Sequence, residues 1–150
     1  MTEKIDIVVR FAKQIEIDAI AKILKDEFNK KPYEEGWTLK TADLKIKYYF
    51  QKATIKVALI DNEIVGFLVY TLEPTSNGAW ARIKELAVNS EFQDKGVGSR
   101  LISDFEREAK VQKINRIVLE TYKIAPAYGF YKKLGYVESG MIELFKELKL

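Results

Sequence analysis

The chain contains no cysteine and no histidine among its 150 residues. Without cysteine it has no disulfide bond, thiolate nucleophile or cysteine-ligated metal. No basic-then-apolar leader opens the chain either, so we expect a cytoplasmic protein. Without histidine it lacks the commonest metal ligand and the commonest general base near neutral pH. We therefore expect no metal site, and any proton transfer must use tyrosine, a carboxylate, lysine or water.

Long apolar runs and a marked excess of one charge are missing as well. No apolar run approaches the roughly 20 residues of a membrane-spanning helix, so we expect no membrane partner. The 25 Lys+Arg and 22 Asp+Glu residues give a net charge of +3. That charge is too small and too dispersed for a nucleic-acid interface, but it suits a small anionic ligand. A chain of this length is expected to form one domain, residues 1–150, around one core.

Hydrophobic periodicity predicts the elements of the first half of the chain. Residues 5–11 alternate with period two, which predicts a strand, and residues 15–29 and 38–51 carry apolar side chains at helical spacing. The runs 53–60 and 63–73 are rich in branched and aromatic residues and are separated by an Asp-Asn pair that tolerates positive φ. They are therefore predicted to form a hairpin.

The second half is predicted to continue the sheet and add two helices. A turn cluster at 74–78 precedes a strand at 80–88, so three neighbouring strands should form an antiparallel meander. A helix over 97–110, a strand over 115–122 and a fourth helix that ends at Gly135 follow.

The last two segments, 136–140 and 141–148, are also predicted to be strands. The element order is then β-α-α-β-β-β-α-β-α-β-β. This is an α+β fold with a mixed, mostly antiparallel twisted sheet of about seven strands flanked by four helices.

The sharpest local feature is the sequence Gln-Asp-Lys-Gly-Val-Gly at 93–98, between a strand and a helix. Gly96 and Gly98 allow the backbone to turn tightly and to approach a ligand. The free N–H groups and the dipole of a helix start attract a phosphate or pyrophosphate. The motif is neither the dinucleotide fingerprint nor a P-loop, so from these residues alone the ligand stays open, and a simple strand-to-helix turn is the alternative.

The segment 86–102, LAVNSEFQDKGVGSRLI, resembles the acetyl-CoA signature of the GNAT acetyltransferase superfamily. Downstream, AYGFYKKLGY at 127–136 resembles the fourth-helix element of the same superfamily, and the predicted element order agrees with the GNAT fold. One departure is Ile124, where many members carry an asparagine. A hydrogen bond to coenzyme A is therefore expected to be missing.

The resemblance implies that acetyl-CoA is the cosubstrate. The pantetheine arm would lie between splayed strands, bonded to the backbone of Leu86, Ala87 and Val88, and Arg100 or Lys95 would reach a ribose phosphate. The loop implied to hold the pyrophosphate comprises Gln93, Asp94, Lys95, Gly96, Val97, Gly98 and Ser99.

The resemblance also implies that Tyr131 is the general acid that protonates the departing thiolate, whereas spacing alone would allow it to be a core aromatic. The expected function is an N-acetyltransferase that moves an acetyl group from acetyl-CoA to a primary amine by direct attack, since no cysteine can carry the acetyl group. The alternative is a non-catalytic acyl-CoA-binding module of the same fold. Superfamily members often dimerise through their last strands, so the segment 141–148 could form a homodimer edge.

The acceptor site and the base are less defined. Glu34 and Glu35 lie in a region that shapes the acceptor pocket in the superfamily, and with Trp37 they could receive a cationic amine of a small molecule or protein. A charged loop tip is the alternative. Several relatives place a glutamate on the fourth strand where this chain has Arg82. Glu85, opposite Leu86 by alternation, is expected to be structural or solvent-exposed. The base stays open between Glu34, Glu35, Glu85 and water.

Overall fold

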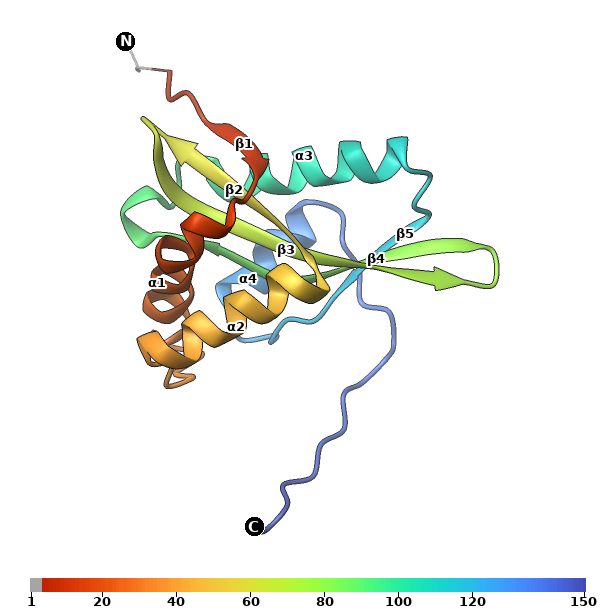
Figure 1. Cartoon of the computed structure of the whole chain (residues 1–150). Helices are drawn as coiled ribbons and strands as arrows, with labels where there is room; N and C mark the ends of the chain where they lie inside the picture. The colour runs from red at the N-terminus through yellow and green to blue at the C-terminus, as the bar shows by residue number, and fades with distance from the viewer. Residues whose placement is uncertain (1–3) are drawn as a thin grey trace. The chain divides into compact units, whose positions relative to one another are not determined.

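The computed structural model describes residues 4–150 and divides the chain into two compact units. The first unit ends at Glu120, and the second is Thr121–Leu150. All the strands of the described residues belong to the first unit, and the second contains the helix α4 (Pro126–Lys133) (Figure 1). The single domain expected from the sequence stays a prediction.

The first unit is built on a five-stranded sheet in the order β1-β2-β3-β4-β5. The first three pairings are antiparallel and the fourth, between β4 and β5, is parallel. The predicted meander and the mixed, mostly antiparallel sheet are therefore confirmed. The strands are β1 (Val8–Phe11), β2 (Thr54–Ile60), β3 (Glu63–Thr75), β4 (Gly78–Val88) and β5 (Arg116–Leu119).

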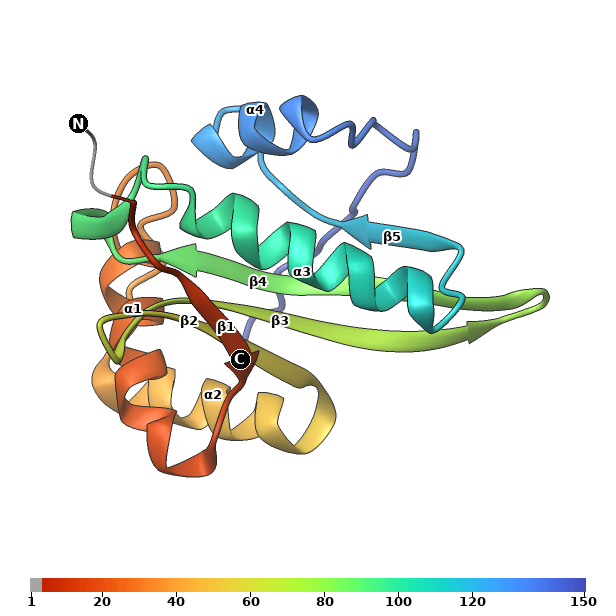
Figure 2. The same cartoon turned by 90° about the horizontal axis from the view of Figure 1, so that it is seen from above.

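Three helices cover the two faces of this sheet (Figure 2). Val69 of β3 belongs to a core that it shares with the first two helices, whereas the ring of the next residue, Tyr70, lies 4.7 Å from that of Phe105 on the third helix. Successive strand residues point to opposite faces, so the helices lie on opposite sides. They are α1 (Ile17–Phe28) and α2 (Leu39–Lys52) on one side and α3 (Val97–Val111) on the other.

The β3–β4 hairpin is longer than predicted, and its tip projects beyond the rest of the sheet (Figure 2). The turn cluster at 74–78 was expected to end the strands, but Pro74 pairs with Ala79 inside the ladder. Pairing of β2 with β3 stops at Tyr70. Proline is tolerated because this part of β3 is bonded to β4 alone.

No helix among residues 4–150 is both long and apolar enough to cross a membrane. In the second unit, α4 ends as predicted. Gly135 has a φ of 93°, and its N–H donates to the Lys132 carbonyl while the N–H of Tyr136 donates to the Tyr131 carbonyl. These two bonds close the helix end in the motif for which glycine is suited.

The two last predicted strands, 136–140 and 141–148, are wrong, and the described sheet has five strands rather than about seven. Residues 141–150 contain no helix or strand in this structure, and their large apolar side chains are exposed. Alternation of apolar residues predicts a face for a strand, but a strand also needs a neighbour that takes up its backbone hydrogen bonds. Within the described chain this segment has no such neighbour. The exposed side chains are Met141, Ile142, Leu144, Phe145, Leu148 and Leu150.

Candidate active site

Strand β4 extends past the end of its parallel partner. The β4–β5 ladder stops at the pair Ile83–Leu119, whereas β4 continues to Val88. On its other edge this stretch stays paired with β3, for example at Leu68–Leu86. Within the described chain, residues 84–88 therefore have one edge that no strand covers. Such an edge can bond the main chain of an extended ligand.

Gly66 of β3 supports this stretch, and the sequence prediction missed it. A Cβ at Gly66 would lie 3.0 Å from the carbonyl oxygen of Ala87 and 3.2 Å from the side chain of Val97. The absence of a side chain therefore lets β4 and the start of α3 approach β3 closely. A lone glycine inside a strand pattern is the sequence signal for such a close approach.

The loop after β4 leads directly into the start of α3. It contains a short 3₁₀ helix, η2 (Ser90–Phe92), and two residues of positive φ, Asp94 at 62° and Gly96 at 83°. Gly96 is the N-cap of α3, and its carbonyl accepts the N–H of Arg100 at 3.0 Å. The preceding N–H groups, those of residues 97–99, have no partner inside the helix. Val97 is buried, which anchors this helix start in the core.

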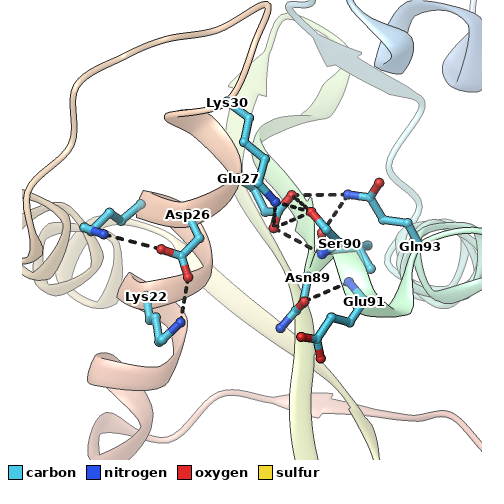
Figure 3. A network of polar contacts seen from close by, with 10 residues as sticks. Lys22, Asp26, Glu27, Lys30, Asn89, Ser90, Glu91 and Gln93 are labelled. Atoms are coloured by element: carbon cyan, nitrogen blue, oxygen red, sulfur yellow. Dashed lines mark hydrogen bonds and ion pairs between the residues drawn. The ribbon is translucent and has the colours of Figure 1, made fainter.

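Glu27 of α1 holds the loop in place (Figure 3). Its carboxylate accepts the Ser90 hydroxyl at 2.8 Å and the Ser90 N–H at 3.1 Å. The same carboxylate accepts the side-chain amide of Gln93 at 3.3 Å, and Lys30 lies 3.1 Å away. Sequence reasoning missed Glu27, since it is 63 positions from Ser90 and no motif includes it.

The side chain of Gln93 has a structural role here. In addition to its bond with Glu27, its amide donates to the Val88 carbonyl at 3.0 Å, which ties the loop back to the end of β4. Lys95 and Arg100 are exposed, and the Lys95 ammonium lies 5.6 Å from the ring of Phe92. The loop therefore presents backbone N–H groups and exposed cations rather than the Gln93 side chain.

Glu85, which was expected to be either structural or solvent-exposed, is not solvent-exposed. It is half-buried, and its carboxylate accepts the hydroxyl of Tyr49 on α2 at 2.8 Å. A β-bulge accounts for its direction: Val69 pairs with Glu85 and Tyr70 pairs with Ile83, so Lys84 is an extra residue in β4. Bulges redirect side chains and occur often beside active sites. Here the bulge turns Glu85 toward α2.

Four groups act on the charge of Glu85. The pKa of its carboxyl is raised from 4.5 to about 7, mainly because burial desolvates the charged form, and the negative charge of Glu35 acts in the same direction. The hydrogen bond from Tyr49 and the charges of Lys45 and Lys84 lower this pKa but do not cancel the burial effect. Burial, followed by the charge of Glu85, raises the pKa of Tyr49, so its hydroxyl stays protonated and able to donate.

The loop between α1 and α2 contains the residues that were predicted to meet the acceptor. Trp37 packs against the core, and its backbone N–H donates to the Asn29 side chain at 2.6 Å. Its indole N–H donates to Glu35 at 2.9 Å. Glu34 and Glu35 are both exposed, and the negative charge of Glu35 acts on Glu85.

Tyr131 belongs to the second unit. Its side chain is buried, and its ring forms edge-on contacts with Phe130 at 5.3 Å and Tyr136 at 5.5 Å between ring centroids. Ile124, the departure from the superfamily pattern, is exposed. The role of Tyr131 at a thioester stays a prediction.

Comparison with known proteins gives a family and several relatives. The model of the acetyltransferase (GNAT) family matches residues 17–136. A protein of Xenopus tropicalis described as "Probable N-acetyltransferase 14" is 33% identical over 94 residues, which are 62% of this chain and 45% of that protein. The chain spans about half the length of the curated relatives it matches.

Solved structures agree with the fold. A possible acetyltransferase from Clostridium difficile 630 has a TM-score of 0.84 at 20% identity, covering 96% of this chain and 99% of that one. An AAC(6')-Iy structure in complex with the bisubstrate analogue CoA-S-monomethyl-acetylneamine has a TM-score of 0.76 at 13% identity, with 96% and 99% covered. The α+β fold predicted from the sequence is thereby confirmed. The family match over residues 17–136 means that this chain belongs to the acetyltransferase (GNAT) family.

Proposed function

We propose that the chain is an N-acetyltransferase that moves the acetyl group of acetyl-CoA onto a primary amine. The observation that carries this proposal is the uncovered edge of β4 at residues 84–88. It is followed at once by the loop that Glu27 holds in place and by the first N–H groups of α3, which have no partner inside the helix. A ligand with an extended arm that ends in a pyrophosphate fits these features in the order in which they follow one another along the chain. Acetyl transfer is the activity of the family.

In this proposal the backbone of Leu86, Ala87 and Val88 bonds the pantetheine arm. The N–H groups of Val97, Gly98 and Ser99 and the loop Gln93–Asp94–Lys95–Gly96 hold the pyrophosphate, and exposed Lys95 and Arg100 add positive charge. Backbone N–H groups at a helix start bind anions well because the helix dipole places partial positive charge there. The missing asparagine at Ile124 removes one side-chain contact and leaves these backbone contacts intact.

The transfer itself is a direct attack. The amine nitrogen attacks the thioester carbon, the C–S bond breaks, and the thiolate takes a proton from the Tyr131 hydroxyl. The tyrosine regains a proton from the nitrogen as the amide forms. Alignment of the two reactants within about 3.5 Å and backbone stabilisation of the oxyanion near Leu86 supply the rest of the rate enhancement.

The acceptor is proposed to be a cationic amine of a small molecule or a protein. Glu35 and Glu85 provide negative charge beside Trp37 and Tyr49, and a cation is attracted both by carboxylates and by aromatic faces. We would test a panel of spermidine, neamine and a peptide with a free N-terminus. Neamine is included because the AAC(6')-Iy complex holds an acetylneamine analogue. The cytoplasmic location expected from the sequence stays a prediction.

Calorimetric titration with acetyl-CoA tests the cofactor site, using wild type, Gly96→Glu and Gly96→Ala. A Cβ at Gly96 meets no atom within 4 Å, so alanine tests only the cost of the positive φ. We expect alanine to retain binding and glutamate to weaken it by roughly tenfold or more, since a negative charge at a helix start repels phosphate. Wild type that does not bind acetyl-CoA would sink the proposal.

Replacement of Tyr131 by phenylalanine tests the general acid. We expect the dissociation constant of acetyl-CoA to stay unchanged and kcat to fall roughly 100-fold, within the range typical of general acid catalysis. Equal kcat for both proteins would assign Tyr131 to packing. Tight acetyl-CoA binding without turnover of any amine by wild type would instead indicate a non-catalytic acyl-CoA-binding module.

A further inference from the structure

We infer that Glu85 is the base that removes a proton from the acceptor ammonium, and that the hydroxyl of Tyr49 positions it. This inference rests on the proposed N-acetyltransferase function. Among the bases that the sequence left open, it selects a residue that alternation had predicted to be structural or exposed. The position that carries a glutamate in several relatives is Arg82 here, and Arg82 is paired with Glu73 at 3.1 Å.

The position of Glu85 in β4 is the first argument. Ile83 is the last residue of β4 that pairs with β5, and Glu85 lies two residues beyond it, immediately before Leu86. The carboxylate is therefore attached where the uncovered edge proposed to bind the pantetheine arm begins. The bulge at Lys84 gives the Glu85 side chain a direction that simple alternation from Ile83 would not.

The fixed position of the Glu85 carboxylate is the second argument. Tyr49 is buried, and its hydroxyl fixes one carboxylate oxygen of Glu85 at 2.8 Å. A carboxylate has about four lone-pair sites, so one hydrogen bond leaves capacity to accept from an ammonium group. Tyr49 itself is held in the core of α1, α2 and the sheet. The base is therefore pre-positioned by the scaffold and not by a flexible loop.

The electrostatic environment of Glu85 suits a general base. The groups that face Glu85 are Tyr49 and Lys45 of α2, Glu35 of the preceding loop and Lys84 of its own strand. Burial raises the pKa of the Glu85 carboxyl to about 7. A general base works best when its pKa is near the working pH, because it is then both partly ionised and basic enough to take a proton.

The other candidate carboxylates are less suited. Glu35 accepts the indole N–H of Trp37, and its negative charge acts on Glu85 from the α1–α2 loop. Glu34 is exposed, as is Glu35, and has a positive φ of 47°. Glu35 is thus suited to attract the cation, while Glu85 takes its proton.

The proton balance is complete without a further reactant. The ammonium gives one proton to the Glu85 carboxylate and becomes a neutral amine. The nitrogen then attacks the thioester carbon, the C–S bond breaks, and the second nitrogen proton replaces the one that Tyr131 gives to sulfur. After product release Glu85 returns its proton to water. One proton enters solution for each amide formed.

Two variants and one control test the inference. Glu85→Gln removes the base and keeps the shape, Tyr49→Phe removes only the hydroxyl, and Glu63→Gln changes an exposed glutamate at the start of β3. For each we would measure acetyl-CoA affinity by calorimetry and kcat/KM against pH with the best amine of the panel. The Glu85 pKa is read from ¹³C NMR of labelled glutamate carboxyls, assigned by comparing wild type with Glu85→Gln.

We expect Glu85→Gln to keep acetyl-CoA affinity, to lose about 10²- to 10⁴-fold in kcat/KM, and to lose the acid limb of the profile. Because the Tyr49 hydroxyl lowers the Glu85 pKa, Tyr49→Phe should move the NMR pKa and the acid limb upward together. If Glu85 were merely structural, the acid limb of the pH profile would not move with its NMR pKa.

Two results separate the inference from the proposed function. If wild type and Glu63→Gln bind acetyl-CoA and turn over an amine, but Glu85→Gln does so equally well with the same acid limb, Glu85 is not the base and the acetyltransferase function stands. If wild type does not bind acetyl-CoA, the proposed function fails and the role of Glu85 fails with it.

Discussion

The Glu85 carboxyl has a consequence for stability that needs no substrate. Its pKa is raised from 4.5 to about 7, so the folded chain holds the proton more tightly than the unfolded chain does. The stability it contributes is therefore present at low pH and is lost as pH rises from about 4.5 to about 7. The shift corresponds to a loss of about 3 kcal/mol at most.

Urea unfolding of wild type and Glu85→Gln at pH 5 and pH 8 would measure this effect. We expect the variant to gain about 2 kcal/mol relative to wild type between the two pH values, because glutamine carries no charge to desolvate. The difference in unfolding free energy between the two proteins is compared at each pH, so the contributions of the other carboxylates cancel. A difference that is the same at both pH values would contradict the raised pKa.

At the scale of elements, Glu27 couples α1 to the loop between β4 and α3. Its carboxylate takes bonds from Ser90 and Gln93 (Figure 3), so Glu27→Ala should free this loop while leaving the loop residues unchanged. We expect acetyl-CoA to bind roughly tenfold more weakly, because the loop must then be ordered on binding. Calorimetry measures the dissociation constant.

Asp26→Ala is the matched control. Asp26 lies beside Glu27 on α1, but its carboxylate pairs with Lys22 at 2.6 Å and with Lys25 at 3.4 Å rather than with the loop. Its removal should leave acetyl-CoA affinity unchanged, since exposed ion pairs on one helix contribute little. Equal weakening by both variants would assign the effect to α1 as a whole.

At the scale of the whole molecule, the last ten residues present exposed apolar side chains, among them Phe145 and Leu148. Exposed apolar surface favours association with a second copy of the chain, and the superfamily resemblance points to the same segment. We expect sedimentation velocity to show reversible self-association that removal of residues 141–150 abolishes. Identical sedimentation of the two chains would exclude this segment as the contact.

Much of the fold was predictable because it depends on local spacing. Period-two and helical patterns located every described strand and α-helix through Gly135, since each needs only its own residues to set its apolar face. The terminal strands failed for the opposite reason: a strand at 141–148 depends on a neighbour, and alternation does not report whether one exists. The turn predicted at Pro74 was wrong for a similar reason. The destabilisation that proline causes in a strand depends on whether another strand, here β2, is bonded to that part of β3.

The glycine loop at 93–98, the helix that starts after Gly96 and the cap at Gly135 could all be predicted from local sequence, because tight turns and helix ends are set by neighbouring residues. The contact of Glu85 with Tyr49, 36 positions away, and that of Glu27 with Ser90 depend instead on how the chain packs. A single extra residue in β4 turns Glu85 to the α2 side. Burial then sets its pKa, and burial is a property of the packed chain, which no local pattern contains.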